Sequence, residues 1–234
     1  MNTVKLQLQQ LAYKFLDPFV KLLIKLGVTP NMVTLLGLIL TLASTVVLIY
    51  GAEMGDRVNH RYIGYAGLII LLAGAMDMVD GRLARVNNQA QPFGALFDSV
   101  IDRYSELIMF FGFCYYTVNQ SYFFTSIFCF ISMIGSIMVS YTRARAEGLG
   151  VKASVGLMQR PERVILVAFA SIATSLLSSK IGGDYRIEVD WFPRPVFETI
   201  SIFSWSIFFL AISANATALR RLVFARNELK KEEQ

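Results

Sequence analysis

Four aspartates lie within apolar sequence in the first half of the chain, and their spacings suit helices. They are Asp77, Asp80, Asp98 and Asp102. The first two are three residues apart and the last two are four apart, so each pair would share one face of a helix. Carboxylates are costly in a membrane segment and usually face a polar cavity. Four of them together would repel one another unless cations neutralised them, and oxygen-only ligands suit Mg²⁺ or Mn²⁺.

A carboxylate cluster of this kind could act on a pyrophosphate. Two metal ions could clamp the pyrophosphate and stabilise both the attacking and the leaving oxygen. Gly81 and Ala84 would let a nucleotide approach the backbone closely, and Gly94, on the same helical face as Asp98 and Asp102, would open the facing wall. A nearby guanidinium could hold a phosphate through two hydrogen bonds. The alternative is that the aspartates only form ion pairs with neighbouring arginines, namely Arg82, Arg85 and Arg103.

The composition indicates an integral membrane protein that positions these groups on helices. The 234 residues are 55% hydrophobic and 17% charged, with a mean hydropathy of +0.51. Several apolar runs approach the roughly 20 residues that span a bilayer as a helix. We expect an all-α fold in which six transmembrane helices follow an N-terminal amphipathic interfacial helix. The six runs cover about residues 30–50, 62–83, 93–117, 122–143, 161–178 and 196–223.

The N-terminal segment over residues 3–26 is expected to lie along the membrane surface. Its polar residues recur every three or four positions: Gln7, Gln10, Lys14, Asp17, Lys21 and Lys25. A lysine-bearing face of this kind favours anionic headgroups. We therefore expect a surface helix over residues 1–28, a catalytic domain over 29–223 and a charged tail over 224–234. The stretch from Arg220 to Gln234 is expected to fray into solvent.

The remaining polar and sulfur-bearing residues suggest no other chemistry. Cys114 and Cys129 lie inside apolar runs and indicate membrane packing rather than a metal site or a disulfide. His60, the only histidine, is expected in a solvated loop. The net charge of +5 is spread along segment ends, so nucleic acid is not an expected partner. Most of the 22 lysines and arginines fall at one set of helix ends, which predicts that both termini and the aspartates face the cytoplasm from a multi-pass cell membrane protein.

Residues 77–102 read D-x2-D-G-x2-A-R-x8-G-x3-D-x3-D. This pattern resembles the signature of the CDP-alcohol phosphotransferase family. The resemblance extends to the six spans, the amphipathic start and the Thr29-Pro30-Asn31 sequence that begins the first span. It implies a transferase of phospholipid biosynthesis that acts as a homodimer. The enzyme would move the phosphatidyl group of CDP-diacylglycerol to the hydroxyl of a polar alcohol and release CMP.

The resemblance also implies roles for individual residues. The four aspartates would bind two Mg²⁺ or Mn²⁺ ions, and Asp102 would be the base that takes a proton from the acceptor hydroxyl. The family often has a hydroxyl residue near Gln91, so the glutamine is a departure. The residues implied to bind the donor nucleotide are Thr29, Pro30, Asn31, Met32, Gly81, Ala84, Arg85 and Gln91.

A second stretch, over residues 140–163, concerns the acceptor. It closely resembles the corresponding part of phosphatidylinositol-phosphate synthases, which use inositol phosphate. Pro161 would begin a helix and place Arg163 near the positive end of its dipole, which favours an anion. Glu147 and Glu162 are expected to orient arginines through ion pairs. The residues expected to bind the acceptor phosphate are Arg143, Arg145, Lys152, Arg160 and Arg163.

Alternatives to this interpretation are open at this stage. Positive-inside topology alone would explain the basic charge, but not the Arg-Pro-Glu-Arg pattern. Free inositol, glycerol phosphate or serine could replace inositol phosphate, because the aspartate pattern does not select among acceptors. A divalent-cation transporter would carry its carboxylates near the bilayer midplane. A membrane hydrolase acting on a pyrophosphate lipid would not need the basic cluster.

Overall fold

The computed structural model describes residues 16–87, 91–156, 158–181, 186–191 and 197–232. The predicted surface helix therefore lies outside the described residues over 1–15, as does the end of the charged tail over 233–234. The described elements are helices apart from two strands of two residues each. This confirms the predicted all-α class, with one small β pairing added.

Six long helices follow a short helical segment over residues 16–25. They are α2 (Pro30–Met54), α3 (Arg61–Val86), α4 (Pro92–Asn119), α5 (Phe123–Glu147), α6 (Arg160–Ile181) and α7 (Ser201–Glu232). Between α6 and α7, β1 (Arg186–Ile187) pairs antiparallel with β2 (Phe197–Glu198). Pro30 and Pro92 lie in the first turns of α2 and α4. Backbone nitrogens in a first turn donate no hydrogen bond within the helix, so a proline costs nothing there.

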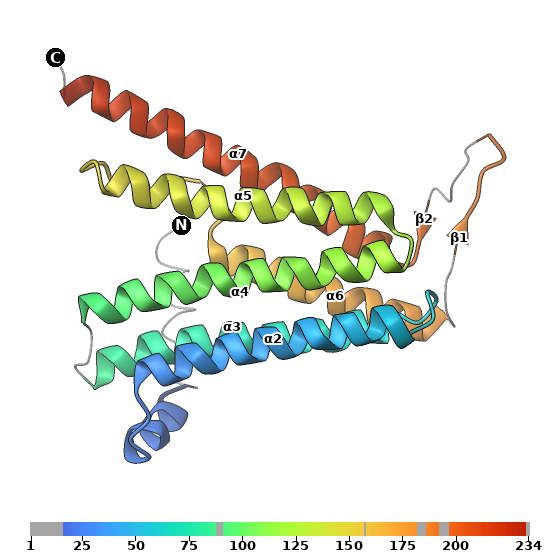
Figure 1. The fold of residues 1–234 in the computed structure, drawn as a ribbon, viewed down its shortest axis with the longest axis horizontal. Coiled ribbons are helices and arrows are strands. Elements are labelled where there is room, and N and C mark those ends of the chain that lie inside the picture. Colours follow the sequence, from blue (N-terminus) through green and yellow to red (C-terminus); the bar gives the residue numbers. More distant parts are fainter. Residues whose placement is uncertain (1–15, 88–90, 157, 182–185, 192–196, 233–234) are drawn as a thin grey trace.

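The six long helices lie side by side (Figure 1), and their mutual contacts close a ring. Following the main contacts, the ring runs α2, α3, α6, α7, α5, α4 and back to α2. In this order α4 and α6 are not neighbours and face one another across the ring. One end of the bundle holds the starts of α2, α4 and α6 and the ends of α3, α5 and α7 (Figure 1, left). We call it the carboxylate end; β1 and β2 lie at the opposite end.

Small residues let neighbouring helices of the ring approach closely. A Cβ added at Gly67 of α3 would lie 2.8 Å from the Ala168 carbonyl oxygen of α6, and one at Gly135 of α5 would lie 2.9 Å from the Ala214 Cβ of α7. Such contacts replace hydrophobic burial as the source of helix association inside lipid. Because α3 and α6 are this close, the end of α3 that carries Asp77 is held beside the start of α6.

The surface of the bundle is that of a multi-pass membrane protein. Among the described residues, α2, α3, α5, α6 and α7 are long and apolar enough to cross a bilayer. Large apolar side chains are exposed along them, including Ile39 (58%) and Phe209 (54%). The 28-residue α4 is not among these five helices. It carries four charged residues within nine positions, Asp98, Asp102, Arg103 and Glu106, and these lower its mean hydropathy.

The helical segment over residues 16–25 docks beside the ends of α2 and α3. Val20 is buried in a cluster with Val33, Val79 and Leu83. Asp17 accepts hydrogen bonds of 2.9 and 3.2 Å from the Arg82 side chain, and this contact holds the pKa of Asp17 below its usual value. The segment therefore packs against the turn of α3 that bears Asp80.

The expectation that the chain frays from Arg220 onward is wrong, because α7 continues to Glu232. Ala225 is buried in a cluster with Val151 and Ala153 of the α5–α6 connection. Apolar contacts therefore hold this charged segment in place. The charged residues themselves lie mostly on the outer face of this helix. Their number alone suggested a free tail, because it does not reveal the apolar face that packs against the bundle.

The expectation of a solvated His60 is also wrong. His60 directly precedes α3 and is fully buried at the opposite end of the bundle. Its ring centroid lies 6.2 Å from that of Tyr122, the residue directly before α5. His60 is therefore packed inside the bundle although Asp56 and Val58 of the same connection are exposed.

Candidate active site

Three aspartates of α3 and α4 converge at the carboxylate end. Asp77, Asp98 and Asp102 each present one carboxylate oxygen, and these three oxygens lie within 4.8 Å of one another. Asp80 is buried beside them but is not part of this group. Its Oδ2 accepts a hydrogen bond of 2.8 Å from Thr34 of α2. The structure thus brings together three of the four predicted ligands and ties the fourth to α2.

The group of three carboxylates fits a divalent metal ion. Its donors are all carboxylate oxygens, which a hard cation such as Mg²⁺ or Mn²⁺ prefers. In the part of the chain that the structure describes, the buried Oδ1 of Asp98 has no hydrogen-bond partner. A buried carboxylate oxygen without a partner is costly, and a bound cation would satisfy it. These three aspartates therefore fit a cation-binding site better than a set of side chains that satisfy one another by hydrogen bonds.

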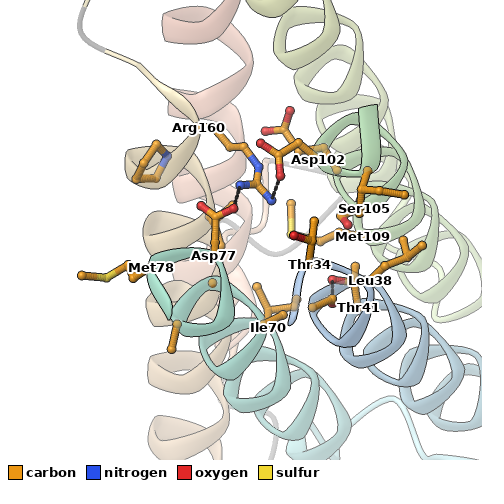
Figure 2. Close-up of a pocket in the computed structure, with 18 of the residues that line it drawn as sticks. Thr34, Leu38, Thr41, Ile70, Asp77, Met78, Asp102, Ser105, Met109 and Arg160 are labelled. Atoms are coloured by element: carbon orange, nitrogen blue, oxygen red, sulfur yellow. Dashed lines mark hydrogen bonds and ion pairs between the residues drawn. The ribbon is translucent and has the colours of Figure 1, made fainter. Parts of the chain in front are cut away.

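One arginine reaches across the ring to these carboxylates. Arg160, the first residue of α6, places Nη1 at 2.6 Å from Oδ1 of Asp77 and Nη2 at 2.8 Å from Oδ1 of Asp102. Figure 2 shows its guanidinium between the two aspartates. Arg103, which the sequence offered as an ion-pair partner, approaches Oδ2 of Asp102 only to 3.9 Å. We call the pair Asp102–Arg160 the outer ion pair.

A second pair joins the same two helices one turn deeper in the bundle. Arg163 donates from Nε and Nη2 to Glu106 at 2.7–3.0 Å, and from Nη1 to the Met158 carbonyl oxygen at 2.9 Å. The Glu106 and Arg163 side chains are 3% and 0% exposed. We call Glu106–Arg163 the inner ion pair. The two ion pairs divide the interior of the carboxylate end into two halves.

The first half contains a cavity of about 240 Å³ between α2, α3, α4 and α6. Its walls are mostly apolar and include Ile70, Met109 and Val164. Its polar lining gathers near the carboxylates, as Figure 2 shows for Thr34 and Ser105. A ligand with a charged end and an apolar body would match this distribution.

The second half contains a cavity of about 470 Å³ between α4, α5, α6 and α7. Asp102, Arg160 and Pro161 line both cavities, so the outer ion pair lies at their common boundary. The basic residues that line the second cavity are Arg103, Arg143, Arg160, Arg163 and Arg221. This concentration of guanidinium groups suits an anionic ligand.

The predicted acceptor-binding residues divide into two sets. Arg143, Arg160 and Arg163 line the second cavity, whereas Arg145 and Lys152 are exposed and do not. Glu147 orients Arg143 through an ion pair of 2.8 Å, which confirms that part of the expectation. The corresponding role of Glu162 stays a prediction.

Two residues of this region were missed from the sequence. Glu106 could have been found, because Asp98, Asp102 and Glu106 recur every four residues and therefore share one helical face. Arg221 lies in the segment that was expected to fray, and no sequence signal distinguishes it from Arg220. It is buried, lines the second cavity, and donates to the carbonyl oxygens of Val139 and Val155 at 2.7 and 2.8 Å.

The residues predicted to bind the donor nucleotide lie together at the carboxylate end, but neither cavity is lined by them. Four stand at the start of α2, three near the end of α3, and Gln91 directly precedes α4. A Cβ added at Gly94 would lie 3.7 Å from Oδ1 of Asn31, so the starts of α2 and α4 adjoin. The Arg85 side chain folds back to donate to the Gly81 carbonyl oxygen at 2.8 Å.

Comparison with known proteins identifies relatives of this arrangement. The family model described as CDP-alcohol phosphatidyltransferase matches residues 27–209. An archaetidylinositol phosphate synthase of Pyrococcus horikoshii is 34% identical over 69% of this chain and 77% of its own length. A phosphatidylinositol phosphate synthase of Streptomyces avermitilis is 30% identical over 92% and 79%. The fold is shared with the Mycobacterium tuberculosis phosphatidylinositol phosphate synthase crystallised with CDP-DAG bound, at a TM-score of 0.70 and 24% identity over 89% and 92% of the two chains.

Proposed function

We propose a function from the premise that the chain belongs to the CDP-alcohol phosphatidyltransferase family. The chain moves a phosphatidyl group from CDP-diacylglycerol to the hydroxyl of a polar acceptor, for which inositol phosphate is the preferred candidate, and releases CMP. The observation that carries this proposal is that Asp102 and Arg160 form the boundary between a carboxylate-capped apolar cavity and an arginine-lined one. A lipid donor and an anionic acceptor would meet at that boundary.

The donor half of the site would be the first cavity and the helix ends above it. The apolar walls would take the lipid near its glycerol, and Asp77, Asp80, Asp98 and Asp102 would face the pyrophosphate through metal. A bound divalent ion would supply positive charge that stabilises the pyrophosphate and the leaving CMP. The predicted nucleotide residues, from Thr29 to Gln91, would hold the cytidine at the bundle end.

The acceptor half would be the second cavity. Arg143, Arg160 and Arg221 would bind the acceptor phosphate, with Arg145 and Lys152 attracting it from the rim. Arg163 contributes charge, but its guanidinium nitrogens are already engaged by Glu106 and Met158. We therefore assign it to shaping the cavity wall. The relatives named as inositol phosphate synthases support a phosphorylated acceptor.

The reaction needs one proton transfer, for which Asp102 is placed. The acceptor hydroxyl oxygen attacks the phosphorus next to the lipid, the bond from that phosphorus to the oxygen of CMP breaks, and CMP leaves. Asp102 takes the hydroxyl proton, because it is the carboxylate that lines both cavities. The acceptor thus gains the phosphatidyl group without a covalent enzyme intermediate.

The membrane arrangement completes the proposal. We place α4 in the bilayer as the sixth span, with its charged face turned to the interior of the ring. The carboxylate end and both termini face the cytoplasm, the chain forms a homodimer, and two Mg²⁺ or Mn²⁺ ions bind per site. The relatives from Pyrococcus horikoshii and Streptomyces avermitilis are named as synthases, which favours a transferase over a cation transporter.

A transfer assay on the purified protein tests this function. It contains CDP-diacylglycerol, Mg²⁺ and inositol phosphate, and it follows CMP and the lipid product by mass spectrometry. We expect equal amounts of CMP and phosphatidylinositol phosphate, loss of both with a chelator, and recovery with added Mg²⁺. Phosphatidic acid released in the absence of any acceptor would instead indicate a hydrolase.

A further inference from the structure

Arg160 occupies an unusual position among the basic residues of the site. Its guanidinium contacts Asp77 and Asp102 at 2.6 and 2.8 Å, and its side chain also lines the arginine-rich second cavity. In the part of the chain that the structure describes, its buried Nε has no hydrogen-bond partner. The Nε–H group of Arg160 can therefore donate a hydrogen bond to an additional acceptor.

The two carboxylates that Arg160 contacts, Asp77 and Asp102, belong to the group of three that fits a metal ion. Oxygen ligands lie about 2.0–2.6 Å from Mg²⁺ or Ca²⁺, so a cation held by these carboxylates would lie close to the guanidinium that contacts them. A guanidinium within 3 Å of them would also repel the cation through like charge. Arg160 and a divalent ion thus compete for Asp77 and Asp102.

The neighbouring arginines of the second cavity are anchored differently. Arg163 is held by Glu106 and Met158, Arg221 by two backbone carbonyl oxygens, and Arg143 by Glu147. Arg103 approaches Asp102 only to 3.9 Å and donates to the Ser99 carbonyl oxygen, so the outer ion pair is the one that holds a metal-site carboxylate at hydrogen-bond distance. Of the arginines just named, Arg160 is therefore the one whose partners a metal ion would take away.

We propose that Arg160 couples metal binding to acceptor binding, which rests on the proposed function. Its guanidinium pairs with Asp77 and Asp102 until a divalent cation binds them, and it then pairs with the phosphate of the acceptor in the second cavity. Each ligand consequently increases the affinity for the other, as thermodynamic linkage requires. The acceptor phosphate is favoured only at a site whose carboxylates are neutralised.

The coupling can be measured without turnover. Purified wild-type protein and Arg160→Gln are titrated with Mn²⁺, with free Mn²⁺ followed by electron paramagnetic resonance, in the absence and presence of saturating sulfate as the phosphate analogue. For wild type we expect sulfate to tighten Mn²⁺ binding about tenfold, within the usual range of coupling between two sites. For Arg160→Gln we expect tighter Mn²⁺ binding than wild type without sulfate, and a sulfate effect below about twofold.

Arg143→Gln is the matched control, because Arg143 lines the same cavity but does not contact the aspartates. It should weaken sulfate binding and leave the Mn²⁺ affinity measured without sulfate unchanged. If it tightened Mn²⁺ binding as much as Arg160→Gln does, general electrostatics would explain the result and the coupling role would be overturned. Independent binding of Mn²⁺ and sulfate to wild type would also overturn it, whereas no Mn²⁺ binding at all would contradict the proposed metal site itself.

Discussion

The outer ion pair, Asp102–Arg160, and the inner ion pair, Glu106–Arg163, connect the same two helices one turn apart. The outer side chains are 13% and 21% exposed and border two cavities, whereas the inner ones are 3% and 0% exposed. Arg163 has a protein acceptor for Nε, Nη1 and Nη2. Arg160 shares its carboxylates with a metal site. Both pairs join a carboxylate of α4 to an arginine of α6, so burial and completed hydrogen bonding, and not the kind of charge, separate a structural pair from a reactive one.

The largest effect should come from the carboxylate of the outer pair. We expect Asp102→Asn to lower kcat by about 10⁴-fold, the upper end for loss of a general base, because a metal ligand is altered as well. The midpoint of thermal unfolding should change little, since Asp102 is already bordered by cavities. Activity assays and thermal unfolding in detergent measure the two quantities on the same sample.

Asp77→Asn serves as the control for this assignment. Both variants lose a metal ligand, but only Asp102 is assigned to the proton transfer. Asp102→Asn should therefore retain more CMP binding than Asp77→Asn does. Full turnover by Asp102→Asn would remove it from the role of base.

The inner pair should respond in the opposite way. Glu106→Leu leaves Arg163 buried without its partner, and we expect a loss of about 3–5 kcal/mol in the free energy of unfolding. The double variant Glu106→Leu/Arg163→Met removes both charges and should recover much of this loss, because replacing a buried pair by apolar residues is often nearly neutral. Denaturant or thermal unfolding measures both.

This comparison can also fail in a defined way. If Glu106→Leu folded with wild-type stability but lost activity as completely as Asp102→Asn, the inner pair would take part in the reaction. The division between a structural and a reactive pair would then be wrong.

Arg160→Gln should have a smaller effect than either change above. Hydrogen bonds to charged groups contribute about 1.5–3 kcal/mol, so the KM for inositol phosphate should rise by roughly 10–100-fold. The midpoint of unfolding should stay near that of wild type, because this guanidinium is partly exposed. Steady-state kinetics with varied inositol phosphate test this, and an unchanged KM with reduced stability would assign Arg160 to structure.

Arg143→Gln should have the smallest effect. Its side chain is 49% exposed and already paired with Glu147, and exposed ion pairs contribute about 0.2–1 kcal/mol. We expect the KM for inositol phosphate to rise by no more than about fivefold. A rise larger than that of Arg160→Gln would show that Arg143, and not Arg160, is the principal phosphate ligand.

The sequence predicted the helical bundle and the convergence of the aspartates because both follow from local rules. Apolar runs mark the helices, and spacings of three and four residues place Asp77, Asp98 and Asp102 on inward faces. Hydropathy alone does not identify α4 as a membrane-spanning helix, because the charged side chains that form the site lower the mean hydropathy of this helix.

The different burial and ion-pair partners of Arg160 and Arg163 could not be predicted from the sequence. They stand three residues apart in one Arg-Pro-Glu-Arg pattern, and only the rotation and depth of α6 against α4 decide which is buried. Arg221 and His60 were misjudged for a related reason. Each is a polar residue in a polar stretch, and its burial depends on segments that are distant in the sequence.

The most direct test of the central claim is the specificity of the purified enzyme for its acceptor. With CDP-diacylglycerol and Mg²⁺ fixed, kcat/KM is measured for inositol phosphate, inositol, glycerol phosphate and serine. We predict that inositol phosphate exceeds free inositol by at least about 10³-fold, because an arginine-lined cavity left without its anion rejects the uncharged analogue. Equal or faster transfer to inositol, glycerol phosphate or serine would contradict the assignment of the second cavity to a phosphorylated inositol.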